Sequence, residues 1–191
     1  MPRRLRCSLL CEDREHEQLF RPILEQMFGR VHVEPRKPGQ PGGFSFVFQS
    51  YARLVKGLVR KYPQEARGLV VVVDGDTAGL AARLREIDQC LEAAGYAKRN
   101  AKEKIAACVP CRNIETWEFW LCGRLDVNES DDYKADWQAE KRKDAMISRK
   151  AAQAWFDQLS EAAKKIEKER LPSLAAGREE LQRLHSLADR G

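Results

Sequence analysis

The feature that most restricts the fold of this chain is an uninterrupted apolar run, Leu-Val-Val-Val-Val, at residues 69–73. Valine is β-branched and fits the pleated surface of a strand. A strand that is apolar at every position needs cover on both faces, which is the situation of a central strand in a parallel sheet. Gly68 and Gly75 bound the run. The sequence therefore predicts a central parallel strand here.

Further strands and helices are expected to alternate along the chain. Apolar segments predict strands at residues 5–11, 31–33 and 104–109, whereas helical spacing of apolar residues predicts helices at 19–28, 46–62 and 80–94. Pro63 is expected to stop the second helix, and the Pro and Gly residues of segment 35–43 predict a loop. This alternation predicts an α/β fold, doubly wound, with a mainly parallel four-stranded sheet.

The length of 191 residues suits one domain with a helical appendage. We expect an α/β core over residues 1–125 and a charged helical extension over residues 126–191 that packs on this core. Within the extension, residues 133–170 predict one or two amphipathic helices.

Composition bounds the partners and the compartment. The net charge is only +5, from 34 Lys plus Arg against 29 Asp plus Glu, so attraction for a polyanion requires clustering of the basic residues. No apolar run approaches the roughly 18 residues that cross a bilayer, and no signal-peptide cleavage site follows the basic start. We expect no membrane role and a cytoplasmic protein. Cys108 and Cys111 form a lone CxxC without a second pair, which predicts reduced thiols rather than zinc.

Acidic residues follow two of the predicted strands. Glu12 ends the first strand, and Asp74-Gly75-Asp76 follows the central one. Ligand sites in parallel sheets lie at the carboxyl ends of the strands, so we expect these carboxylates to converge. Carboxylates that approach one another raise each other's pKa, and a divalent cation relieves the repulsion. Mg²⁺, or Mn²⁺ in its place, takes such oxygen ligands together with substrate phosphate, which suits phosphodiester chemistry.

Two motifs in this order resemble the Toprim signature: Leu9-Leu10-Cys11-Glu12 followed by a helix, and then the run at 70–73 followed by Asp74-Gly75-Asp76. Toprim proteins include topoisomerases, bacterial primases, old-family nucleases and recombination factors. Ile114-Glu115-Thr116-Trp117 and Leu171-Pro172-Ser173-Leu174 are similar to segments of small bacterial Toprim-like proteins that often occur among defence genes. The resemblance implies a metal site formed by Glu12, Asp74 and Asp76.

Several positions keep two readings. Many relatives have Glu-Gly at the first motif, whereas this chain has Glu12-Asp13, followed by Glu15 and Glu17. Either Glu12 is the metal-site acid with Glu17 assisting it, or the extra charge alters metal binding or abolishes catalysis. Asp76 could also be the N-cap of the next helix. Glu115 is either a fourth catalytic acid or a first-turn acid that the helix dipole favours.

The leading hypothesis is Mg²⁺-dependent hydrolysis of DNA or RNA in bacterial defence or stress response. One alternative is a non-catalytic Toprim-like module that binds nucleic acid or a partner ATPase. Another is a phosphatase of the haloacid-dehalogenase type, although its acidic motif usually ends the first strand. The candidate nucleic-acid contacts are Arg112, Lys134, Lys141, Arg142 and Lys143, but acids intersperse the last three and equally indicate a solvated helix face. The oligomeric state stays open, and a homo-oligomer is compatible with the sequence.

Overall fold

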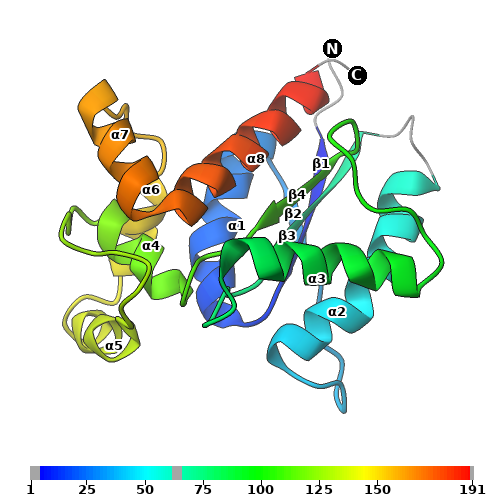
Figure 1. Ribbon diagram of the computed structural model, residues 1–191, viewed down its shortest axis with the longest axis horizontal. Helices are drawn as coiled ribbons and strands as arrows, with labels where there is room; N and C mark the ends of the chain where they lie inside the picture. Colours follow the sequence, from blue (N-terminus) through cyan, green and yellow to red (C-terminus); the bar gives the residue numbers. More distant parts are fainter. Residues whose placement is uncertain (1–4, 62–65, 190–191) are drawn as a thin grey trace.

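The computed structural model describes residues 5–61 and 66–189 and has a four-stranded sheet at its centre (Figure 1). The strands are β1 (Arg6–Cys11), β2 (Val31–Val33), β3 (Arg67–Val72) and β4 (Ile105–Cys108). They are all parallel and lie in the order β2-β1-β3-β4. The α/β fold class expected from the alternation is confirmed, and the apolar run is a central strand.

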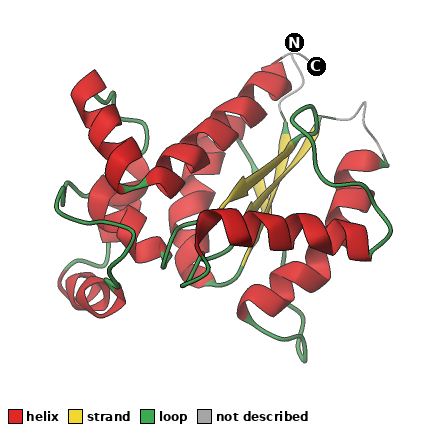
Figure 2. Ribbon diagram, in the orientation of Figure 1, coloured by secondary structure: helices red, strands yellow, loops and turns green. Residues whose placement is uncertain are grey.

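Helices cover both faces of this sheet, as Figure 2 shows. One layer contains α1 (Arg14–Phe28) and α8 (Pro172–Asp189), and the other contains α2 (Gly43–Leu54), a π-helical segment η1 (Val55–Arg60) and α3 (Gly79–Ala93). A group of shorter helices packs outside α1 and α8: α4 (Ile114–Leu121), α5 (Lys134–Lys143), α6 (Ile147–Ala154) and α7 (Glu161–Arg170).

The central strand β3 shows why its sequence has no polar alternation. Val70 and Val72 pack with the layer of α1 and α8, whereas Leu69 and Val71 pack with the layer of α2 and α3. All four side chains are fully buried. Since successive residues of a strand point to opposite faces, both faces must be apolar when both are covered.

Two helix predictions need correction. The helix expected at 46–62 begins earlier, at Gly43, and is divided into α2 and η1; Tyr62 and Pro63 lie outside the described residues. The one or two helices expected over residues 133–170 are three. The breaks have local causes: Asp144 is extended and its side chain accepts a hydrogen bond from the Met146 N–H, and Ser160 caps α7 through the Ala163 N–H.

Helix α8 lies in the helical extension expected from residue 126, although its bounds were not predicted, and it covers the sheet beside β4. Glu180 Oε2 accepts a hydrogen bond from the Ala107 N–H at 3.2 Å, and Arg183 donates to the Glu103 carbonyl at 3.0 Å, so side chains of α8 cover the outer edge of β4. Leu174, Leu181 and Leu184 belong to the same core cluster as the sheet residues. The expected extension from residue 126 therefore shares the core of the α/β unit. No helix in the described part of the chain is long and apolar enough to span a bilayer.

Candidate functional site

Glu12 and Asp74 lie at the same edge of the sheet because their strands are parallel neighbours. Cys11 pairs with Val72 in the ladder between β1 and β3, so the residues that follow them leave the sheet together. Glu12 Oε1 accepts a hydrogen bond from the Asp74 N–H at 2.9 Å. This bond ties the carboxyl ends of the two central strands.

Asp76 lies on a sharply turned loop beyond Asp74. Its φ of 45° is in the left-handed region, which costs a non-glycine residue energy but is tolerated best by Asp and Asn. Gly75 makes the turn feasible: its N–H donates to the Pro110 carbonyl at 2.6 Å, and a Cβ there would lie 3.1 Å from the same oxygen. Asp76 also forms an isolated antiparallel bridge with Arg112. The contacts of Gly75 with Pro110 and of Asp76 with Arg112 therefore stabilise the turned backbone of this loop.

Arg83, on α3, binds this loop from the side. Its Nε donates to the Asp74 carbonyl at 2.9 Å, and its Nη2 lies 2.8 Å from Asp76 Oδ2. The guanidinium also lies over the Phe44 ring, 3.9 Å from the centroid, and the residue is buried. Arg83 thus compensates the charge of Asp76 and fixes the loop's position.

A buried histidine occupies the other side of Asp74. The His16 Nε2 lies 3.0 Å from Asp74 Oδ1, and the Nδ1 lies 2.9 Å from Asp13 Oδ1. Burial lowers the pKa of His16, but the hydrogen bonds and charges of Asp13 and Asp74 outweigh it and raise that pKa to about 10. At neutral pH the ring is therefore an imidazolium that donates to both carboxylates.

The position of His16 follows from the cap of α1. Asp13 is the N-cap, and its Oδ1 accepts hydrogen bonds from the Glu15 and His16 N–H groups. Burial raises the pKa of Asp13, but the bond to His16 and its positive charge bring it down to about 2. The departure from Glu-Gly at this motif therefore creates an Asp-His-Asp chain, and the only sequence signal for it is the spacing of Asp13 and His16.

Glu12 and Glu115 are the two acids of the site whose pKa values are raised. Burial raises the pKa of Glu12, and the nearby charges of Asp74 and Asp76 raise it further against the opposing effect of His16. Glu115, buried on the first turn of α4, has a pKa that burial raises, with the charge of Asp74 adding to the effect and that of Lys134 opposing it. Because the charges of Asp74 and Lys134 both affect the pKa of Glu115, Glu115 and Lys134 lie near the strand-end acids.

The side chains as they stand do not form a ready metal site: the described residues contain no group of three His, Cys, Asp or Glu side chains placed to hold an ion. The donor set nevertheless fits a hard cation. Glu12, Asp74 and Asp76 each keep one carboxylate oxygen that accepts no hydrogen bond from another described residue. Mg²⁺ usually binds one or two carboxylates and keeps several waters, so it needs only one or two of these oxygens.

The basic residues expected to bind nucleic acid divide into two groups. The backbone of Arg112 forms a β-bridge with the backbone of Asp76, and Lys134, the first residue of α5, lies close enough to Glu115 to affect its pKa. Both basic residues are therefore near the acids. On α5, Lys141 pairs with Glu15 and bonds Gln18, Arg142 Nε donates to the Gln138 carbonyl, and Lys143 pairs with Glu140. The α5 cluster is therefore already engaged within the chain.

In this site the buried His16 holds the Asp74 carboxylate, the buried Arg83 holds the Asp76 carboxylate, and the Asp74 N–H holds that of Glu12. Comparisons of the chain with protein-family models, with curated proteins and with solved structures give no match.

Proposed function

We propose that the chain is a Toprim-type hydrolase that uses Mg²⁺ to cleave phosphodiester bonds of DNA or RNA, as an effector in bacterial defence or stress response. The observation that carries the proposal is the hydrogen bond between Glu12 Oε1 and the Asp74 N–H. It joins acidic residues from the ends of two adjacent parallel strands, which is where open α/β sheets bind ligands.

Each acid has a role that its environment supports. Asp74 and Asp76 would bind the metal through their remaining oxygens, and Glu12 would complete the set. Bound Mg²⁺ would supply positive charge beside the scissile phosphate. The raised pKa of Glu12 suits it to accept a proton from the attacking water. Arg112 and Lys134 would supply positive charge for a phosphate bound next to these acids.

A second candidate is a non-catalytic module that binds nucleic acid or a partner ATPase. The observation in its favour is that His16 and Arg83 already neutralise Asp74 and Asp76 without any metal. Since these pairs compensate the charges of Asp74 and Asp76, the site would keep its geometry without a metal and would bind nucleic acid or a partner protein without cleaving it.

A cleavage assay on plasmid, single-stranded DNA and tRNA, with Mg²⁺ or Mn²⁺, separates the two candidates. Asp76→Ala should lower the cleavage rate at least about a hundredfold, on the order of 3 kcal/mol in barrier, because it removes a group that acts in the transition state. Asp136→Ala is the matched control, since Asp136 and Asp76 are both 63% exposed and both paired with an arginine. Binding of nucleic acid without cleavage under every metal condition, even with a partner ATPase added, would show that the chain is a binding module.

A further inference from the structure

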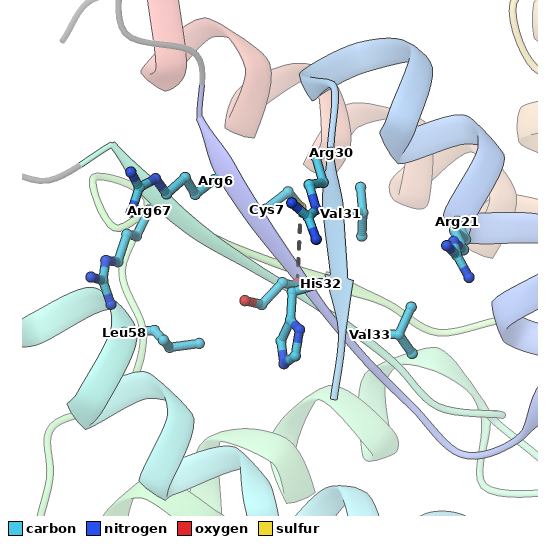
Figure 3. A pocket seen from close by; sticks show the side chains of 10 residues that line it. Arg6, Cys7, Arg21, Arg30, Val31, His32, Val33, Leu58 and Arg67 are labelled. Atoms are coloured by element: carbon cyan, nitrogen blue, oxygen red, sulfur yellow. Dashed lines mark hydrogen bonds between the residues drawn. The ribbon is translucent and has the colours of Figure 1, made fainter. Parts of the chain in front are cut away.

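A second surface lies over β2 and the starts of β1 and β3 (Figure 3). A cleft of about 770 Å³ there is lined by Arg6, Arg21, Arg30, Arg67 and His32, and none of its described lining residues is acidic. The chain's net charge is small, so this local excess of arginine is the clustering that attraction for a polyanion requires.

The edge of β2 is open, in contrast to the edge of β4. Glu34 N–H donates to the Leu9 carbonyl at 2.9 Å, so alternation turns the N–H groups of Val31 and Val33 outward. No hydrogen bond between described residues covers this outer edge, whereas α8 covers that of β4. Unpaired backbone groups on an edge strand are available to a ligand.

The arginines reach the cleft from several elements. Arg6 and Arg67 are paired residues at the starts of β1 and β3 and lie together at one end, and Arg21 of α1 lies beyond β2 at the other (Figure 3). Arg6 and Arg30 are exposed and form no ion pair with another described residue. Arg21 bonds Glu17 and Glu25, yet half of its side chain remains exposed. The positive charge that no described acid compensates therefore lies at Arg6 and Arg30.

This cleft continues to the acidic site. A neighbouring cleft of about 710 Å³ shares Arg21 and Val33 with the first. Its charged lining residues are Arg14, Arg21 and Arg36 together with the acids Glu12, Asp13, Glu17 and Glu34. The path runs along the length of β1, whose six residues span about 20 Å at about 3.3 Å per residue. That length accommodates several successive phosphates of a nucleic-acid strand.

We propose that the two adjoining clefts form one nucleic-acid track, in which the phosphate backbone of a strand passes Arg6, Arg30 and Arg21 and leads to Glu12. Guanidinium groups bind phosphate in a bidentate manner, and repeated charges along 20 Å suit a polyanion better than a single anion. An acidic peptide that adds to the sheet is disfavoured because β2 has only three residues to pair with. The direction of the track toward Glu12 rests on the proposed function, but binding to the arginines does not.

Fluorescence anisotropy with a labelled 20-nucleotide single strand, of DNA and of RNA, tests the track on the full chain in EDTA, which prevents cleavage. The double variant Arg6→Ala/Arg30→Ala should lose at least about tenfold in affinity at low salt. Its salt dependence should fall by about 1.4 in log-log slope, from two lost phosphate contacts at about 0.7 each. Arg85→Ala/Arg149→Ala removes the same charge from exposed residues elsewhere and should lose little.

Equal losses in the two double variants would overturn the track, because net charge alone would then explain binding. Displacement of the strand by polyglutamate as readily as by unlabelled DNA would also overturn it. Thermal melting checks that the double variant folds, and Arg30→Glu alone provides a second variant. Asp76→Ala should bind like wild type in this assay. A wild type that binds through Arg6 and Arg30 but cuts no nucleic acid with Mg²⁺ or Mn²⁺ would reject the proposed hydrolase and keep the track. Cleavage that needs Asp76 but ignores Arg6 and Arg30 would do the reverse.

Discussion

The Nε2 of His16 lies 3.0 Å from Oδ1 of Asp74, which is 58 residues away in the sequence. This contact binds the first turn of α1 to the loop that follows β3. The imidazole is fully buried, and its other nitrogen is held by Asp13. Three groups from two segments thus form one charged unit inside the sheet's carboxyl edge. The unit links the stability of the fold to the geometry of the candidate site.

Replacing His16 by Ala should destabilise the fold. Removing the buried cation leaves Asp74 without a partner beside Glu12, and breaking a buried ion pair costs about 3 kcal/mol or more. Urea denaturation should show this loss in the free energy of unfolding. His32→Ala is the control, because His32 is 66% exposed and a surface change of this kind stays within about 0.5 kcal/mol. Similar stabilities of the two variants would mean that the buried unit contributes nothing.

Mg²⁺ should raise the melting temperature of the wild type. A ligand that binds only the folded state stabilises it by mass action, by about 2.7 kcal/mol at a hundred times its Kd. Asp74→Asn should remove most of this rise, since it takes away a charged ligand, whereas Asp136→Asn should keep it. A rise of the same size in wild type and Asp74→Asn would place the metal elsewhere.

Stability should also fall with rising pH because of Glu118. Both carboxylate oxygens of Glu118 are buried and form no hydrogen bond of good geometry with a described residue, and only the nearby Ser148 hydroxyl favours the charged form through weak hydrogen bonding. Burial raises the pKa of Glu118 from 4.5 to about 8, with the charges of Glu115 and Glu15 adding to it and Lys141 opposing it. Between these values the unfolded chain ionises while the folded chain stays neutral, so stability drops by up to about 1.4 kcal/mol per pH unit and levels off above the folded pKa.

Glu118→Gln should abolish this contribution and make the protein more stable than wild type at pH 8. Urea denaturation at pH 5 and at pH 8 measures the difference. Glu179→Gln, at an exposed acid of α8, should leave the pH dependence as it is in wild type. An unchanged pH profile in Glu118→Gln would show that Glu118 ionises normally in the folded state.

Two glycine substitutions should change stability in opposite directions. At Gly57 a Cβ meets no atom within 4 Å, so Gly57→Ala should stabilise by about 0.5–1 kcal/mol through lost freedom of the unfolded chain. At Gly177 a Cβ would lie 2.5 Å from the Trp117 ring, so Gly177→Ala should destabilise by about 1–3 kcal/mol. Thermal melting of both variants decides this, and a stabilised Gly177→Ala would mean that α8 can move away from Trp117.

The sequence predicted the sheet well because its signals are local. The apolar run at 69–73 and the acids directly behind it identify a strand and its carboxyl end without any knowledge of partners. The same reasoning placed Glu12 correctly at the end of its strand, since both acids follow strands of one parallel sheet. The sequence therefore predicted the strands and the acids at their ends, whereas it missed the helix breaks at Asp144 and Ser160, although their causes are also local.

The missing parts depend on distant neighbours. The pairings of His16 with Asp74 and of Arg83 with Asp76 require the packing of α1 and α3 against the sheet, and no spacing encodes them. The arginine cleft combines Arg6 with Arg67 only because β1 and β3 pair in register. The bounds of α8 within the expected helical extension were not predicted, because its apolar residues are few in a charged segment and their packing partner, β4, is distant in the sequence.

The late position of α8 in the chain has a consequence for synthesis on the ribosome. About 80 residues separate the end of β4 from the end of α8. At the usual 5–20 residues per second, the face of the sheet that α8 covers stays uncovered for about 4 to 16 s after β4 has been made. During that interval Trp117 and the edge of β4 lack their cover, so a nascent chain at this stage is the form in which a chaperone would meet the protein.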